Sequence, residues 1–540
     1  MIGIHSLPLE TLTHIFRLFF IEDDDFIWDF ERVYCDILEA NRALEETMLV
    51  CKHWYFAAKS FPRLWTRIPV SWPMGVAALE TRLRRSAPLP VKIYMTSSDL
   101  NLLRLLNNYA ARLQEFHVNT DYNLTDDEAA DGVEIMVNPA PLLERLSFVW
   151  YYRFHWGDTL DGLFGGVMPR LTKLCIYPCE PFPQDQFRNL TRLHLIRQAD
   201  QGTYTLPELL DTLRANPTLE ELILWAAVPA NCPGHREGSF LDCVPLPKLR
   251  ILHLTYYWPE DIHLFCHMVL PRGVHTVIQE LPIEGTSSGI ERYLPMIFNM
   301  WKRLYVVAKM SISYCDSVWD MLGIESSAER GGGSAFRFRC RLSPRSCRFF
   351  SVLLMGTLGL DRLSELWFES YMADAEKIFE ERMWVAVLAA APSLHTICVR
   401  GCVTIPILTA LIYRSNENVA PVPCPLLQTV KIYDEPRISS TALNIFTMYR
   451  HQVGYPISEL EISFKTDAES VPQQGDVQAC VGSILSLGVI RRADIRYAVE
   501  MDDRPRVCPP PICTRGSEHG QDFAPHPPPD KPTCTIRLHH

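Results

Sequence analysis

The chain has 540 residues, of which 47% are hydrophobic and 11% aromatic, and its formal net charge is −11. This apolar content is ample for a large buried core, so global disorder is excluded. The negative charge argues against nucleic-acid wrapping, which needs a basic stripe. No apolar run approaches the ~20 residues of a membrane helix. The N-terminus lacks a secretory signal, so the seventeen cysteines predict reduced thiols in the cytoplasm or nucleus.

The stretch from Leu7 to Trp65 has helical patterning. Pro8 suits the first position of a helix, and Glu10 complements the positive end of the helix dipole. Two amphipathic faces follow, one formed by Leu9, Leu12, Phe16 and Phe19, and one by Leu44, Met48, Cys51 and Ala58. Fifty or so residues of this kind are too few for an independent core, so we expect a partner to cover part of them.

Four ordered phrases in this stretch carry a family resemblance. Leu-Pro-x-Glu, Ile-Phe, Leu-Val-Cys-Lys-x-Trp and a closing Leu-Trp are matched by Leu7, Pro8, Glu10, Ile15, Phe16, Leu49, Val50, Cys51, Lys52, Trp54, Leu64 and Trp65. Residues 1–68 therefore resemble the F-box motif. The resemblance implies docking on a Skp-family adaptor, and through it a cullin, by Leu7, Pro8, Leu12, Ile15, Phe16, Leu49, Val50 and Trp54.

An insert at 21–43 departs from the family pattern, which has a short linker here. It begins with the acidic run 22–25 and continues with apolar residues at roughly helical spacing. The insert is either an extra helix that leaves the motif intact, which we favour, or a segment that weakens adaptor binding.

From Leu113 onward one phrase, Leu-x-x-Leu-x-Leu with substitutions, recurs at steps of mostly 28 to 33 residues. Its copies begin at Leu113, Leu143, Leu171, Leu190, Leu219, Leu249, Leu363, Leu394, Leu427 and Ile457. Helical patterns lie between copies, at 206–213, 384–391, 442–449 and 477–487. This alternation is typical of leucine-rich repeats. It predicts an α/β solenoid with a parallel inner sheet over residues 69–500, following the small all-α N-terminal segment.

The period fails at 257–360, where an apolar helical pattern at 290–307 precedes an alternating strand around Phe336, Phe338 and Cys340. We interpret this region as degenerate repeats, with an insertion as the alternative. Residues 501–540 are rich in proline and poor in apolar residues, so we expect a disordered tail.

No sequence motif indicates a catalytic site, and we expect neither a cofactor nor a metal. The pairs Cys175/Cys179 and Cys398/Cys402 resemble half zinc sites, but Cys179 and Cys402 stand where the repeat favours Asn or Cys at the strand's end. The tail residues Cys508, Cys513, Cys534, His519 and His526 are irregularly spaced.

Outward-facing strand residues are the expected target-binding residues, because they line the concave face of a solenoid. They are Arg145, Lys173, Tyr177, Arg192, His194, Trp225, His253, Trp367, Glu369, Arg400, Lys431 and Tyr433. Arg and aromatic side chains anchor protein interfaces, and the basic ones hint at an acidic or phosphorylated partner. The whole pattern resembles F-box proteins with C-terminal leucine-rich repeats, which implies a non-catalytic substrate receptor of a Skp–cullin–F-box type ubiquitin ligase. The alternative is a leucine-rich-repeat interaction scaffold without ligase assembly.

Overall fold

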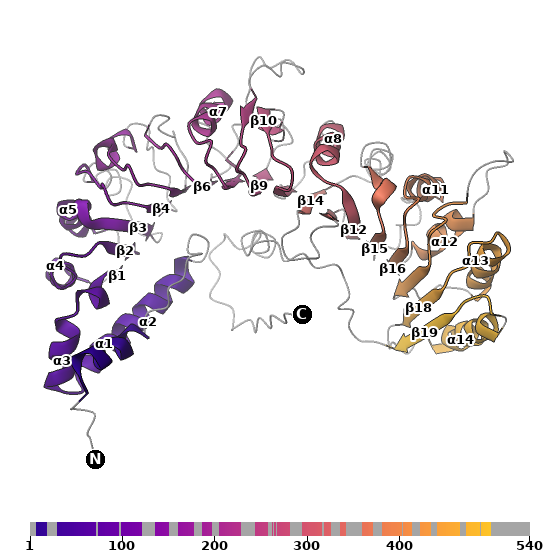
Figure 1. Cartoon of the computed structure of the whole chain (residues 1–540), viewed down its shortest axis with the longest axis horizontal. Helices are drawn as coiled ribbons and strands as arrows, with labels where there is room; N and C mark the ends of the chain where they lie inside the picture. Colours follow the sequence, from indigo (N-terminus) through magenta and orange to yellow (C-terminus); the bar gives the residue numbers. More distant parts are fainter. Residues whose placement is uncertain are drawn as a thin grey trace. The chain divides into compact units, whose positions relative to one another are not determined.

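Figure 1 shows the computed structural model of the chain. The structure describes residues 7–18, 30–71, 74–96, 99–120, 136–150, 160–177, 186–196, 205–227, 243–256, 262, 264–265, 267–280, 294–315, 318–325, 335–341, 359–370, 381–401, 403–412, 422–433, 440–464, 471–486 and 488–497. All of these belong to one compact unit, residues 1–505. The predicted disordered tail, the acidic run 22–25, Cys179 and Cys402 lie outside the described residues.

Seventeen strands form one large, mostly parallel sheet. In chain order they are β1 (Arg67–Val70), β2 (Val91–Met95), β3 (Leu113–Thr120), β4 (Arg145–Trp150), β5 (Lys173–Tyr177), β6 (Arg192–Ile196), β7 (Glu221–Trp225), β9 (Ile251–Tyr256), β11 (His275–Glu280), β12 (Val307–Cys315), β13 (Val318–Glu325), β14 (Ala335–Arg341), β15 (Glu365–Ser370), β16 (Thr396–Gly401), β17 (Thr429–Tyr433), β18 (Glu459–Phe464) and β19 (Arg492–Tyr497). The short strands β8 (Val244–Pro245) and β10 (Met268–Val269) pair separately.

Helices alternate with many of these strands. The α-helices in the described ranges are α1 (Leu9–Arg17), α2 (Phe30–Met48), α3 (Lys52–Lys59), α4 (Val76–Arg85), α5 (Leu100–Asn108), α7 (Leu206–Arg214), α8 (Leu294–Leu304), α11 (Glu381–Ala389), α12 (Thr404–Ile412), α13 (Ser440–Gln452) and α14 (Val471–Ser486). The same ranges also contain the 3₁₀ segments η3 (Pro62–Trp65), η4 (Ala110–Arg112), η5 (Leu160–Gly166) and η10 (Leu360–Arg362). None of these helices has both the length and the apolarity that crossing a bilayer requires.

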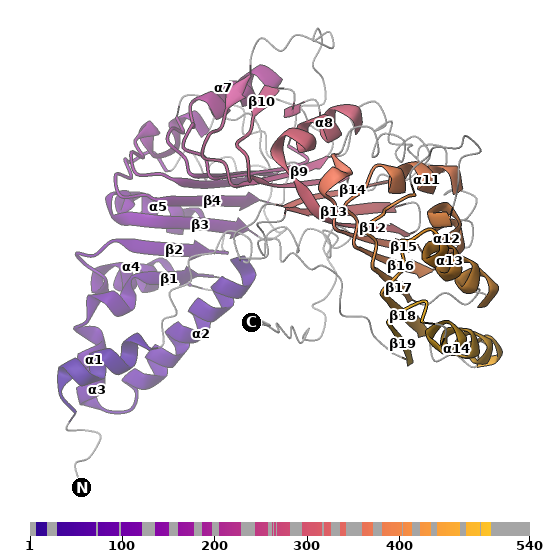
Figure 2. The same cartoon turned by 45° about the vertical axis from the view of Figure 1, so that its right-hand side comes forward.

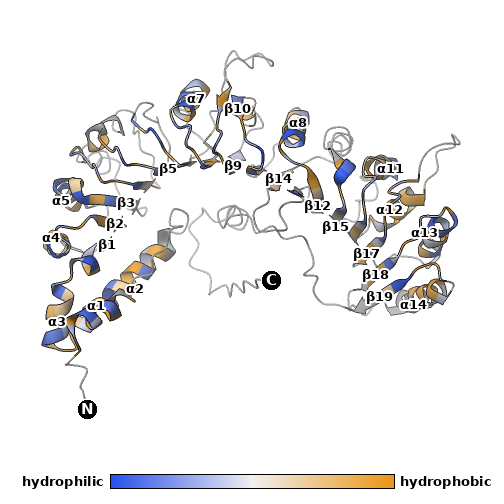
Figure 3. Cartoon of the chain, viewed as in Figure 1, coloured by the Kyte–Doolittle hydropathy of each residue, from blue (hydrophilic) through white to orange (hydrophobic). Residues whose placement is uncertain are grey.

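Helices α4 to α14 lie against one face of the sheet (Figures 1 and 2). Their apolar sides and the inward strand residues share one continuous buried core. Helix α12 is hydrophobic along its length (Figure 3) because it packs between α11 and α13 as well as against the sheet. The mixed α/β architecture with a parallel sheet is therefore as expected and is compatible with a solenoid-like arrangement.

Every copy of the repeated phrase lies on a strand, and its fourth and sixth residues face the core. In the second copy, for example, Leu146 and Phe148 of β4 are buried against the helices. The helices expected at 206–213, 384–391, 442–449 and 477–487 are α7, α11, α13 and α14. Local periodicity therefore predicted these elements well.

The irregular stretch differs from the degenerate repeats that we expected. Strand β13 pairs antiparallel with both β12 and β14, while β14 pairs with β11 and β12 pairs with β15. After β11 the chain enters the sheet again at β12, three strand positions away from β11. It then runs back through the antiparallel strand β13 to β14, which lies beside β11. A strand–helix unit is absent between β12 and β14 within the described ranges, so the helical period is lost there.

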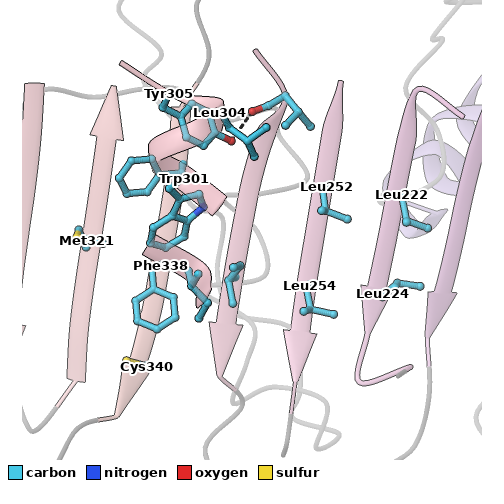
Figure 4. Close-up of a cluster of buried hydrophobic side chains, with 14 of the residues drawn as sticks. Leu222, Leu224, Leu252, Leu254, Trp301, Leu304, Tyr305, Met321, Phe338 and Cys340 are labelled. Carbon is cyan, nitrogen blue, oxygen red and sulfur yellow. Dashed lines mark hydrogen bonds between the residues drawn. The ribbon is translucent and has the colours of Figure 1, made fainter. Parts of the chain in front are cut away.

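Helix α8 covers this part of the sheet. Trp301 stacks on Phe336 with ring centroids 4.3 Å apart, and its indole nitrogen lies 3.2 Å from Thr276 Oγ1. The Tyr305 hydroxyl donates to the Val274 carbonyl oxygen at 2.5 Å. Figure 4 shows Trp301 and Tyr305 of α8 over the part of the sheet that carries Phe338, with Leu252 and Leu254 on a strand beside it. The antiparallel segment therefore shares the core of the parallel strands.

The N-terminal cluster, which we define as α1, the described part of α2, α3 and η3, has its own small core. Leu12, Phe16, Leu44, Met48, Ala57, Ala58, Leu64 and Trp65 are its buried residues. The sequence predicted one helix through Leu44, Met48, Cys51 and Ala58. The structure has two, because the chain turns at Leu49–Val50 and Cys51 caps α3 in an extended conformation.

The described part of the insert is the N-terminal half of α2. Ile37 is buried with Tyr94 of β2, and Val33 and Tyr34 pack beside them. The Asn41 amide donates to the Arg67 carbonyl oxygen of β1 at 3.4 Å. The described part of the insert therefore lengthens α2, which also packs on the first strands of the sheet, and is not a separate extra helix. Whether the insert weakens adaptor binding stays a prediction.

Candidate protein-binding surfaces

The N-terminal cluster exposes several large apolar side chains. Leu49 and Val50, in the turn between α2 and α3, are 84% and 52% exposed, and Phe56 on α3 is 62% exposed. Leu9 and Leu18 at the two ends of α1 are also exposed. Burying an exposed leucine stabilises by about 1.5–3 kcal/mol, so a set of this kind favours a partner over water. We call these five residues the exposed apolar set.

The structure separates the predicted adaptor-contacting residues into two groups. Leu12 and Phe16 have no exposed surface and form the cluster's core, so a partner does not reach them. Trp54 is half-buried and packs edge-on against Phe16, with ring centroids 5.7 Å apart. Half-buried Leu7 and Ile15 pack against the core, while Pro8, Leu49 and Val50 are exposed. Pro8 precedes α1 as its N-cap residue.

The second candidate surface is the open face, meaning the sheet face opposite helices α4 to α14. The third position of the phrase is charged on the five neighbouring strands β3 to β7, and Lys92 of β2 is in register with these residues. This charged row consists of Lys92, Glu115, Arg145, Lys173, Arg192 and Glu221 on β2 to β7. Two carboxylates thus stand among four cations.

The carboxylate of Glu115 is buried between cations. Its Oε1 lies 2.8 Å from Lys92 Nζ and 3.6 Å from Arg145 Nε, and its Oε2 accepts from the Tyr94 hydroxyl at 3.2 Å. Burial alone would raise the pKa of Glu115, but His117 and Lys92 outweigh burial and hold that pKa below its usual range. Glu115 is therefore an anion at neutral pH.

Glu221 repeats this arrangement at the other end of the row. Its Oε1 lies 2.8 Å from His194 Nε2, and its Oε2 lies 3.3 Å from Arg192 Nε. Burial lowers the pKa of His194 despite the adjacent carboxylate, so the imidazole is neutral near pH 7. Both carboxylates are at most 5% exposed, whereas Lys92 and Arg192 are 26% and 29% exposed. The accessible part of the charged row is therefore mainly cationic.

The fifth position of the phrase forms the floor of the open face. Its residues on β2 to β9 are all buried, namely Tyr94, His117, Ser147, Cys175, His194, Ile223 and His253. His194 and His253, which we predicted as target-binding residues, therefore lie in this floor and have almost no exposed surface. Burial raises the pKa of the Cys175 thiol to about 12, so it is unreactive.

Toward the C-terminal end of the sheet, the open face has a shallow pocket. Trp367 and Tyr433 lie nearly parallel across Cys398, with ring centroids 6.2 Å apart, and both are buried. Arg400 donates to Glu369 at 3.2 Å, and Lys431 Nζ lies 3.4 Å from Glu461 Oε2. Of the remaining predicted contacts, Trp225 is half-buried on β7, and the side chain of Tyr177 lies outside the described residues.

Within the described ranges, no group of three or more His, Cys, Asp or Glu residues is arranged to hold a metal ion. The buried titratable groups of the open face pair with one another or lie in the floor. No protein-family model matches the chain, and a search of curated proteins also found no match.

Several of these residues escaped the sequence analysis. Glu115 and Glu221 occupy the same phrase position as Arg145 and Arg192, so strand alternation could have found them. Lys92 lies on β2, before the first counted repeat. Phe56 follows the family phrase by two residues, and only the packing of Ala57 and Ala58 places it outward.

Proposed function

We propose that the chain is the substrate receptor of a Skp–cullin–F-box type ubiquitin ligase. The N-terminal cluster is the F-box, and its exposed apolar set, with Pro8 and half-buried Leu7, Ile15 and Trp54, docks on a Skp-family adaptor. The repeats hold the target protein on the open face. The receptor raises the effective concentration of the target near the conjugating enzyme and supplies no catalytic group.

The observation that carries this proposal is the exposure of Leu49 and Val50 next to a closed core. These two residues match the Leu-Val-Cys-Lys-x-Trp phrase, yet neither side chain belongs to the cluster's core. Exposed apolar residues at matched motif positions favour a protein partner. The described part of the insert packs on Tyr94, away from this turn, which supports adaptor binding with the insert present.

The test is co-purification of the full chain with a Skp-family adaptor. The double substitution Leu49→Ser, Val50→Ser removes two exposed apolar contacts and should weaken the complex at least about tenfold, at ~1.4 kcal/mol per decade. Because both side chains are exposed, the melting temperature of the free chain should change little. Ile445→Ser on α13 is a matched control, since Ile445 is also 52% exposed and lies on another element.

Adaptor binding by the wild type and the control, with loss in the double variant, would support the receptor function. Absence of binding by folded wild-type protein would refute it. A chain lacking residues 21–29 would then separate an insert that blocks the adaptor from a scaffold that never assembles a ligase.

A further inference from the structure

The antiparallel strands β13 and β14 interrupt the repeats in the middle of the sheet. They lie between β11, which ends one block of parallel strands, and β12, which pairs with the next block. Trp319 and Met321 of β13 and Phe338 of β14 belong to the core, so the alternate residues of both strands face the open side. Natural proteins often depart from their own regular pattern at functional sites, which makes this part of the open face a candidate for a target contact.

Arg339 of β14 has no partner within the described ranges. It is half-buried, and in the strand register it lies directly opposite Asp320 of β13. Asp320 nevertheless pairs with Arg337, whose Nε and second terminal nitrogen donate to the two carboxylate oxygens at 3.0 Å and 2.6 Å. Among the residues that the structure describes, Arg339 takes part in no ion pair or hydrogen bond. Two guanidinium groups thus stand beside one carboxylate, and among these three residues one positive charge is uncompensated.

A carboxylate from another molecule would satisfy Arg339. A guanidinium that is partly removed from water loses solvation, and this loss is costly when no acceptor replaces it. A carboxylate replaces it well, because it can accept two parallel hydrogen bonds from a guanidinium. Half-buried Val318 and Leu322 lie on the same side of β13, before and after Asp320, and offer apolar contact beside this charge. Arginine next to apolar surface is typical of the energetic centre of protein interfaces.

We propose that the open face at β13 and β14 binds an aspartate or glutamate side chain of the target protein through Arg339, with apolar contacts from Val318 and Leu322. This inference rests on the proposed receptor function and names the contact that the target must supply. One guanidinium with apolar neighbours fits one carboxylate within a mixed polar and apolar segment. The carboxylate of Asp320 lies opposite Arg339 and disfavours a ligand with a second negative charge, such as a phosphate.

The probe is a phage library of random twelve-residue peptides, fused at their C-termini so that only side chains supply carboxylates. Peptides are selected on the full chain and then depleted on its Arg339→Gln variant. We expect the remaining peptides to carry Asp or Glu beside apolar residues, because only the wild type offers the unpaired guanidinium.

Binding of a selected peptide is then measured by fluorescence anisotropy in a double-mutant cycle. Exchange of its acidic residue for the matching amide and Arg339→Gln should each weaken binding about tenfold, and together no more than either alone. Arg339→Lys should retain part of the affinity, because lysine keeps the charge and loses the bidentate geometry. Arg303→Gln, at an exposed position of α8 on the other face of the sheet, makes the same charge change and should have no effect.

Because Arg339 makes no ion pair within the described ranges, the melting temperature of Arg339→Gln should stay near that of the wild type. A loss of affinity then reports binding and not unfolding. Absence of peptides that depend on Arg339, or selected peptides without Asp or Glu, would overturn the inference. Additive effects in the cycle, or tighter binding of a peptide with phosphoserine in place of its acidic residue, would also overturn it. Adaptor binding uses the N-terminal cluster, so its loss and the loss of peptide binding are separate outcomes.

Discussion

At the scale of single residues, two glycines make different demands on the backbone. Gly401, at the end of β16, has a φ of +86°, and a Cβ there would lie 1.9 Å from the Ser370 carbonyl oxygen. Gly454 after α13 has a φ of +83°, but a Cβ there would meet nothing within 4 Å. The first glycine is needed for both conformation and space, and the second for conformation alone.

Comparing Gly401→Ala with Gly454→Ala separates the cost of the left-handed backbone from the cost of the steric clash. Left-handed backbone costs an L-residue about 1–2 kcal/mol, so Gly454→Ala should lower the unfolding free energy by about this amount. Gly401→Ala adds the clash with Ser370 and should cost clearly more, because β15 and β16 must separate. Thermal unfolding of both variants measures the difference, and equal melting temperatures would contradict the close approach.

At the scale of elements, α2 joins the N-terminal cluster to the sheet. Its C-terminal half contributes Leu44 and Met48 to the cluster's core, and its N-terminal half places Ile37 against Tyr94. Glu45 also pairs with Arg82 of α4 at 2.8 Å. One helix therefore couples the candidate adaptor surface to the first strands of the sheet.

Ile37→Ala should loosen this coupling. Removing a buried isoleucine side chain costs about 2–5 kcal/mol, and the loss falls on the contact with Tyr94. Amide hydrogen exchange within 30–43 should accelerate, while exchange at 44–65 stays near its wild-type rate. Glu39→Ala, at an exposed position of the same helix, is the matched control. Uniform acceleration across the cluster would show instead that α2 is part of a single cooperative core.

At the scale of the whole molecule, buried histidines are distributed along the open face. His117, His194 and His253 lie on β3, β6 and β9 and have at most 1% exposed surface. Burial lowers the pKa of each, and for His253, with Arg337 and His194 adding to burial, the pKa falls to about 4. The folded chain therefore holds these imidazoles neutral over a pH range in which the unfolded chain protonates them.

Mild acid should consequently destabilise the protein. The stabilising contribution is complete above pH ~6.5, the unfolded pKa of histidine, and is lost as the pH falls toward the folded value. For His253 the loss by pH 4 amounts to about 3 kcal/mol. The melting temperature should drop between pH 6.5 and 4.5, and His253→Gln should flatten this decline. An unchanged decline in that variant would show that other groups carry the acid sensitivity.

The sequence by itself determined the local elements of this protein. Hydrophobic periodicity depends on near neighbours in the chain, so it located the strands of every counted repeat, the helices α7, α11, α13 and α14, and the outward positions of Arg145, Lys173 and Arg192. It did not locate α12. The motif phrases likewise pointed to Leu49 and Val50. These are the parts of both candidate surfaces that could be predicted.

Only the tertiary structure decided strand order and burial, because both depend on contacts between residues far apart in the chain. The antiparallel β13, the break between α2 and α3, and the packing of Ile37 on Tyr94 have no local signature. Leu12 and Phe16 are buried in the core of the N-terminal cluster, whereas Leu49 and Val50 are exposed. The same long-range packing placed Glu115 and Glu221 beneath their neighbours and gave the open face its accessible cations.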